Sequence, residues 1–174
     1  EQSYFFEPNK QIAENISVNQ SHPNSNIKAN VNLFTSADIL VFTSSQNVHK
    51  IQNRGFNNIT QVLEQIEFEE GEKPIYLTGT KNYSGYLIVA FENGKAGKIT
   101  LISYRTENNR KKLKNAFTDE SKLIFIEHVE NDIDLIALSS INKVVLFNTS
   151  KINSVESRTT KGVQVMKPKD GSSM

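Results

Sequence analysis

Three segments repeat one pattern, an apolar run, a polar turn and a second apolar or alternating run, and this repeat limits the possible folds most. The segments are Asp38–Ile51, Tyr86–Leu101 and Asp134–Phe147. Aligning Ile39, Tyr86 and Leu135 gives spacings of 47 and 49 residues. A period of this length is typical of propellers and solenoids, in which each repeat is one supersecondary unit stacked on its neighbours.

Each repeated segment has the signals of a β-hairpin with further strands around it. Asn93-Gly94 stands at the turn of the second segment, and both residues tolerate the positive φ that tight hairpin turns require. Short strands are expected before the hairpins, at Ile27–Phe34, Lys73–Leu77 and Lys122–Glu130. Polar, basic loops follow the hairpins, at Gln52–Asn58, Arg105–Lys114 and Lys151–Lys161.

These elements predict an all-β fold of propeller-like blades, each with about four antiparallel strands. A further strand is expected at Gly162–Met166. The residues from Ile59 to Ile66 have helical periodicity, but the blade register favours a strand there. We expect three blades at about 27–70, 71–118 and 119–168, within a region 27–174 that ends in a short tail. Residues 1–26 are interpreted as the remnant of a preceding blade or an arm, and the chain as part of a longer protein.

The charge is unevenly distributed although the net charge is only +1. Residues 1–80 carry −4 and residues 81–174 carry +5, so the neutral total can conceal a basic face in the second half. There is no cysteine, which excludes a disulfide framework, a thiolate metal site and a cysteine nucleophile. No apolar run approaches the roughly 20 residues of a membrane helix, so no membrane partner is expected.

No enzyme motif is found in the sequence. His22, His49 and His128 stand alone, without the spacing of metal ligands. The segment Glu92–Lys98 lacks the first glycine and the final Ser/Thr of a phosphate-binding loop, and a hairpin turn is the better interpretation. Phe68–Glu72 lacks the alternating ligands of a calcium loop and is interpreted as an acidic turn. We therefore expect no catalytic residue, no metal site and no enzymatic activity from this chain alone.

The segment Asn142–Met166 resembles a blade from the C-terminal domain of the A subunit of bacterial type IIA DNA topoisomerases, which are DNA gyrase and topoisomerase IV. The matching positions are Phe147, Asn148, Ser150, Arg158, Thr159, Lys161, Gly162 and Val163. Arg110-Lys111 is similar to an Arg-Lys pair in the family, but the glycines that usually follow are absent. The resemblance covers about residues 27–166.

The resemblance implies a β-pinwheel that binds duplex DNA and bends it around a basic rim, without catalysing a reaction. The parent would be an ATP-dependent isomerase whose catalytic tyrosine, ATPase and Mg²⁺ site lie in other domains or subunits, so this chain would hold no cofactor. The implied partners are duplex DNA, the rest of the A subunit and the ATPase B subunit. The implied location is the bacterial cytoplasm, at the nucleoid.

A glycine-rich box distinguishes gyrase within this family. The nearest segment here is Gln52–Asn58, which has Gln52, Arg54 and Gly55 but lacks both later glycines of the box. A degenerate box resembles topoisomerase IV more than gyrase, and both assignments stay open. The sequence also leaves open the full number of blades, the handedness of wrapping and the oligomeric state.

Basic residues in and around the loops are the candidate DNA-binding residues. Loops at equivalent places in successive blades project from one edge, where lysine and arginine would contact phosphates without reading base sequence. The candidates are Lys50, Arg54, Lys98, Arg105, Arg110, Lys111, Lys151, Arg158 and Lys161. Each could instead be an ordinary solvated cation. The alternative function for the whole chain is a protein-interaction propeller that binds no nucleic acid.

Overall fold

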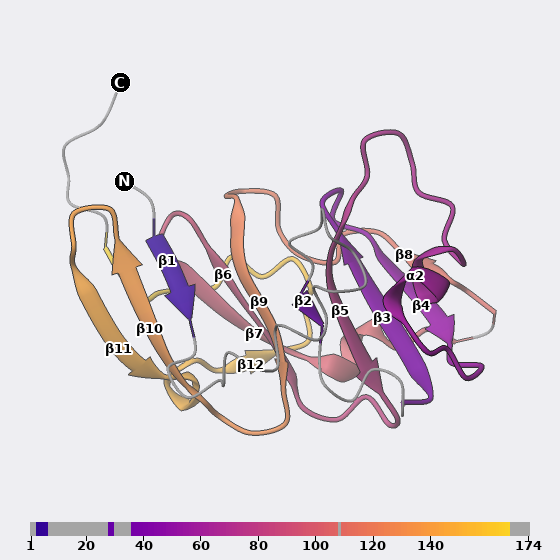
Figure 1. Cartoon of the computed structure of the whole chain (residues 1–174). Coiled ribbons are helices and arrows are strands. Elements are labelled where there is room, and N and C mark those ends of the chain that lie inside the picture. The colour runs from indigo at the N-terminus through magenta and orange to yellow at the C-terminus, as the bar shows by residue number, and fades with distance from the viewer. Residues whose placement is uncertain (1–2, 7–27, 30–35, 108, 168–174) are drawn as a thin grey trace. The chain divides into compact units, whose positions relative to one another are not determined.

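The computed structural model describes residues 3–6, 28–29, 36–107 and 109–167. The chain divides into two compact units, which are treated separately below (Figure 1). Unit 1 comprises residues 1–9, 85–103 and 117–174, and unit 2 comprises residues 10–84 and 104–116. Strands dominate both units, and the pairs are mainly antiparallel. The all-β fold class is therefore confirmed.

Unit 2 is built on one five-stranded sheet. Its strand order is β2 (Lys28–Ala29), β5 (Pro74–Thr80), β3 (Asp38–Thr43), β4 (Val48–Gln52) and β8 (Lys112–Leu113). The apolar residues of β3 are buried throughout, as expected of a central strand. Ile39, Val41 and Leu77 pack with Ile59 and Val62 of a short helix in one core cluster.

Unit 1 contains two sheets. The larger follows the order β9 (Leu123–Val129), β6 (Tyr86–Phe91), β7 (Lys95–Thr100) and β12 (Ser154–Val155), and β13 (Val163–Gln164) also pairs with β7. The smaller sheet has the order β1 (Ser3–Phe6), β10 (Asp134–Ser139) and β11 (Val144–Asn148). The two sheets share a core cluster that includes Ile88, Phe125, Leu135, Ala137 and Met166. Two 3-10 turns, Leu101–Tyr104 and Thr149–Lys151, follow β7 and β11.

The three predicted hairpins are present, and their registers repeat every 48 residues. The cross-strand pairs Ile39–Ile51, Leu87–Ile99 and Leu135–Phe147 occupy equivalent positions. The turn residues Gln46, Gly94 and Asn142 have φ values of +52°, +78° and +61° at the same interval. The sequence alignment placed Tyr86 at the position equivalent to Ile39 and Leu135. The structure places Leu87 there instead, one residue later. A shift of one residue matters in a strand because it moves every side chain to the opposite face.

The strand pairing also differs from the expected blades. The strand before a hairpin pairs with the preceding hairpin, so β5 pairs with β3 and β9 pairs with β6. The loop after the second hairpin supplies β8 to β4, and the loop after the third supplies β13 to β7. The sheets are therefore interleaved along the chain, and the contiguous segments 27–70, 71–118 and 119–168 do not each form one sheet. Hydrogen bonding at the open edges of a hairpin explains this exchange, because later segments satisfy those edges.

The strand expected from Ile59 to Ile66 is wrong, because the helix α2 spans Ile59–Leu63. Asn58 caps it by accepting a hydrogen bond from the Gln61 N–H at 3.0 Å. Ile59 and Val62, three residues apart, are the buried pair of the helix. The helical periodicity was therefore the correct signal, and the register of the repeat was misleading.

The remaining expected elements are present in shorter form or lie outside the described residues. The strand expected at Gly162–Met166 is limited to β13, and the strand expected at Ile27–Phe34 is described only as β2. The proposed N-terminal remnant contributes β1, which pairs with β10 of the third hairpin. The other residues of 1–26 and the tail 168–174 lie outside the described residues.

Candidate nucleic-acid interface

Three of the candidate DNA-binding residues line one cavity in unit 2. Lys50, Arg54 and Lys111 come from β4, from the turn after β4 and from the residue before β8. The cavity has a volume of about 690 Å³. It is lined by Asp38, Lys50, Ile51, Gln52, Arg54, Phe56, Gln65, Asn109 and Lys111. Three cations against one carboxylate make this lining cationic, which suits an anionic ligand.

Backbone pairing at the edge of β4 brings these cations together. The Lys50 N–H donates to the Lys111 carbonyl at 2.7 Å, and the Lys50 ammonium donates to the Thr106 carbonyl at 3.4 Å. Arg54 follows Asn53, whose side-chain amide donates to the Ser36 carbonyl at 2.8 Å. Lys50 is half-buried, whereas Arg54 and Lys111 are exposed. The two exposed cations are therefore free to approach a phosphate.

A buried carboxylate lies beside β8, the strand that follows Lys111. Glu72 accepts hydrogen bonds from the Thr43 hydroxyl at 2.6 Å and the Asn47 amide at 2.7 Å, and His49 Nε2 lies 3.3 Å from it. Burial alone raises the pKa of Glu72, but hydrogen bonds from Thr43, the Glu69 N–H and Asn47 outweigh it and lower the pKa to about 2. Glu72 is therefore ionised at neutral pH, inside the protein.

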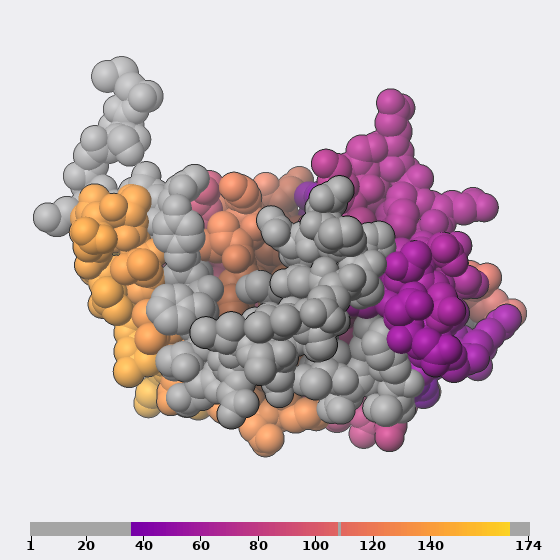
Figure 2. Space-filling view, in the orientation of Figure 1, coloured from indigo at the N-terminus to yellow at the C-terminus, as the bar shows by residue number. Residues whose placement is uncertain are grey.

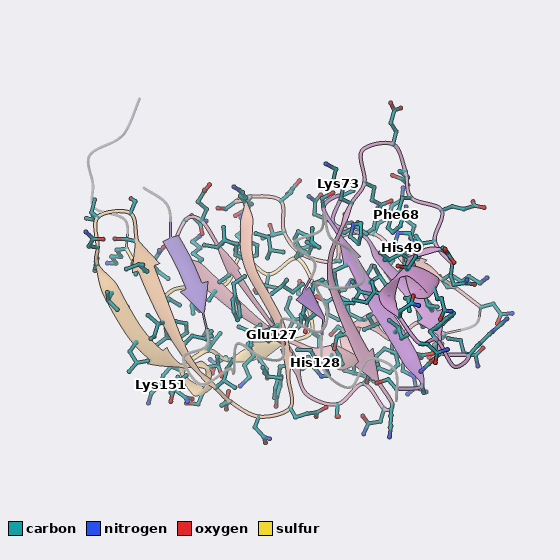
Figure 3. The ribbon with its side chains drawn as sticks, in the orientation of Figure 1. His49, Phe68, Lys73, Glu127, His128 and Lys151 are labelled. Carbon is teal, nitrogen blue, oxygen red and sulfur yellow. The ribbon has the colours of Figure 1, made fainter. Side chains whose placement is uncertain are left out.

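Lys112 joins this carboxylate cluster to the candidate interface. Its ammonium lies 2.6 Å from Glu69 Oε1 and 3.9 Å from Glu72 Oε2. The hydrogen bond from Lys112 is the main reason that the pKa of Glu69 is lowered. The acidic turn was identified in the sequence, but its role in holding β8 was not. Figure 3 shows His49 beside Phe68 of the same turn, with ring centroids 5.8 Å apart.

Arg105 and Arg110 also lie in unit 2 and are exposed. Arg110 Nε donates to the Lys112 carbonyl at 3.1 Å, which leaves the rest of its guanidinium available. Arg105 lies close enough to Tyr83 to lower the pKa of that phenol, although burial and the Asp38 carboxylate outweigh it and raise the pKa. Neither arginine lines the cavity.

Lys98 in unit 1 is not placed to contact a phosphate. It is buried at 6% exposure, its ammonium lies 2.5 Å from Asp132 Oδ1, and it stands 4.4 Å from the Tyr86 ring centroid. The hydrogen bond from Lys98, with a second from Thr149, lowers the pKa of Asp132. Lys98 therefore neutralises a carboxylate of its own unit, which its position in the repeat could not reveal.

The other three candidates in unit 1 differ in how exposed their side chains are and in whether they have a partner within the protein. Lys161 pairs with Glu120 at 2.5 Å while staying 68% exposed, and this hydrogen bond raises the pKa of Lys161. Arg158 is half-buried and donates to the Ser103 carbonyl at 3.0 Å. Lys151 ends a 3-10 turn and is exposed (Figure 3).

The sequence features that were considered for other kinds of site are a hairpin turn and the histidines. Asn93-Gly94 is a hairpin turn between β6 and β7, as expected. His128 is buried and lies 3.7 Å from Glu130, and His22 lies outside the described residues. Within those residues, no three His, Cys, Asp or Glu side chains gather as a metal site. The described helices are also too short to cross a membrane.

Solved structures of topoisomerase C-terminal domains are similar to this fold. The first, a C-terminal domain of DNA topoisomerase IV, gives a TM-score of 0.61 at 18% identity. The match covers 79% of this chain and 45% of the topoisomerase IV domain. The chain has the fold of a topoisomerase C-terminal domain. A DNA gyrase A C-terminal domain matches at a TM-score of 0.52 and 20% identity, covering 78% of this chain and 45% of that one.

The third structure is the C-terminal domain of E. coli ParC, with a TM-score of 0.54 and 13% identity, covering 76% of this chain and 55% of that one. The chain thus spans about half the length of the topoisomerase C-terminal domains that it matches. No family model matches the sequence, and no curated protein matches it. The fold of these domains, a β-pinwheel, agrees with the resemblance carried by residues 142–166.

Proposed function

We propose that this chain is a non-catalytic DNA-binding and DNA-bending domain of a type IIA topoisomerase A subunit. The observation that carries the proposal is the cavity of unit 2, where Lys50, Arg54 and Lys111 converge. The fold shared with topoisomerase IV and gyrase A domains supports it. Lysine and arginine side chains gathered in this way suit the phosphate backbone of duplex DNA.

The chemistry of the cavity favours backbone contacts over base reading. The guanidinium group of arginine and the ammonium group of lysine neutralise phosphates and release counterions. The binding free energy gained in this way does not depend on base sequence. Arg54 and Lys111 are exposed, so both can approach a phosphate. Arg105, Arg110 and Lys151 are proposed as additional contacts.

Fluorescence anisotropy with a labelled duplex across a salt series tests the proposal. The wild-type chain should bind duplexes of different sequence alike, with affinity falling steeply as salt rises. The double variant Arg54→Glu, Lys111→Glu should flatten the slope of log affinity against log salt by about 2, because about 0.9 is lost per phosphate contact. At 0.1 M salt this corresponds to roughly 60-fold weaker binding.

A matched control separates local contacts from net charge. Lys73→Glu with Lys81→Glu makes the same charge change at exposed sites of unit 2 outside the cavity lining. This control should bind nearly as well as the wild type. Equal loss in both double variants would reject the cavity as the interface. A wild-type chain that ignores duplex DNA at low salt would favour a protein-interaction module instead.

The proposed role places the chemistry of strand passage elsewhere in the parent enzyme. We propose that the rest of the A subunit and the ATPase B subunit supply the cleavage, Mg²⁺ and ATP chemistry, in the bacterial cytoplasm at the nucleoid. The purified chain should neither relax supercoiled plasmid nor hydrolyse ATP. Relaxation that persists through further purification would contradict a purely DNA-presenting role.

A further inference from the structure

The third hairpin has an outer edge that no described strand covers. The outer edge of β4 is paired with β8, and the outer edge of β7 is paired with β12 and β13. The equivalent strand β11 ends its sheet, whose order is β1, β10 and β11 (Figure 1). The hairpins share one register, so their edges can be compared position by position.

Equivalent apolar positions are buried in two hairpins and exposed in the third. Val48 on β4 is 2% exposed and Ala96 on β7 is 0% exposed, whereas Val144 on β11 is 61% exposed. Leu146 on the same strand is 66% exposed. Atoms of β11 (orange) form open surface in Figure 2. The cluster that buries Ala96 contains Ile152 and Met166, which flank the covering strands β12 and β13, together with Leu135 and Ala137 of β10. Within the described residues, no strand is paired with the outer edge of β11.

The backbone of β11 presents its hydrogen-bonding groups outward at these residues. The Ser139 N–H donates to the Lys143 carbonyl, and the Thr149 N–H donates to the Ile133 carbonyl. In an antiparallel pair this pattern alternates, so the odd-numbered residues of β11 direct their backbone N–H and C=O groups toward β10. Val144 and Leu146 therefore direct their N–H and C=O groups away from the sheet. At the position equivalent to Leu146, Lys50 donates its N–H to a covering segment. Such an edge is a template for another strand.

We propose that β11 is the interface of a homodimer, formed by antiparallel pairing of β11 with β11 of a second copy. The side chains make this edge complementary to itself. With Leu146 opposite its own counterpart, Val144 faces Asn148 and Val145 faces Phe147 along the length of β11. No like charges are opposed in this register. Leucine at position 146, where the other hairpins have Lys50 and Lys98, favours an apolar partner.

Sedimentation equilibrium of the purified chain tests this interface directly. The 19.6 kDa chain should show a concentration-dependent rise toward about twice its mass. Leu146→Lys should weaken this association at least tenfold, because it opposes two lysines across the interface. The control Ile102→Lys changes another exposed apolar residue of unit 1 and should leave the association unchanged. A monomer at all concentrations, or equal loss in both variants, would overturn the proposal.

A cross-linking test does not depend on the stability of the lysine variant. The chain has no cysteine, so Leu146→Cys introduces a single thiol. In the proposed register two such thiols face each other, and mild oxidation should give a covalent dimer in most of the protein. Ile102→Cys under the same conditions should stay largely monomeric. Equal cross-linking of both variants would reject β11 as the interface, and neither result affects DNA binding by unit 2.

Discussion

At the scale of single residues, the buried carboxylate of Glu72 has the most consequences. Its side chain is fully buried, and five groups from three parts of unit 2 converge on it: Thr43, Asn47, His49, the Glu69 N–H and Lys112. A charge in such a site is stable only because its hydrogen bonds replace water. Removing the charge should therefore affect both the stability of unit 2 and the placement of β8.

Glu72→Gln should lower the free energy of unfolding by about 1–3 kcal/mol, because donors that face the carboxylate lose a charged acceptor. Urea unfolding at neutral pH measures this loss. Glu70→Gln changes an exposed glutamate of the same turn and should have little effect. Equal stability of Glu72→Gln and the wild type would show that the cluster contributes no net stabilisation.

The lowered pKa of Glu72 also predicts a pH dependence. Its pKa falls from 4.5 to about 2 on folding, so the folded state favours the ionised form. The corresponding stabilisation is present above about pH 4.5 and is lost as the pH falls toward 2. Unfolding free energies measured between pH 5 and 2 should fall more steeply for the wild type than for Glu72→Gln. Parallel curves would contradict the lowered pKa.

At the scale of elements, each covered hairpin depends on a short strand supplied from a later loop. Strand β13 has only two residues, Val163 and Gln164, and β8 is equally short. Gly162 permits the approach of β13 because its φ is +71° and a Cβ there would lie 2.5 Å from the Ala96 carbonyl oxygen. The backbone contact leaves no room for any side chain.

Gly162→Ala should therefore detach β13 from β7 and destabilise unit 1 by about 1–3 kcal/mol. Hydrogen exchange should become faster at Ala96, which pairs with Val163, while amides of unit 2 keep their protection. As a control, Thr159→Ala changes an exposed residue nearby and should leave exchange at Ala96 unchanged. Unaltered protection in Gly162→Ala would mean that β13 contributes little to its sheet.

At the scale of the whole molecule, the proposed function requires bending as well as binding. Smooth bending of a 20–30 bp site costs on the order of 1–6 kcal/mol, and contacts from several repeats must offset it. Energy transfer between dyes at the two ends of a 30 bp duplex should therefore rise when the wild-type chain binds. In Arg54→Glu, Lys111→Glu at saturating protein, the rise should be smaller. Binding without any change in energy transfer would refute bending and leave the binding proposal intact.

The sequence by itself determined the hairpins and their turns, because these depend on neighbours within about 15 residues. Apolar runs and the Asn93-Gly94 turn predicted each hairpin to within one residue of register. The resemblance at residues 142–166 likewise predicted the fold that the solved topoisomerase domains share. Both signals are local in the chain, and side-chain alternation and turn conformation are set by local sterics.

Only the tertiary structure decided which strands pair with each other, that residues 59–63 form the helix α2, and whether each candidate cation is exposed or paired. The partner of β4 comes from residues 112–113, and the partner of Lys98 is Asp132, 34 residues away. Such pairings depend on which distant segments meet in space. The residue types and their local spacing do not reveal this. Lys98 and Lys111 are therefore alike in the sequence, yet burial against a carboxylate neutralises the first while the edge of a sheet presents the second to solvent.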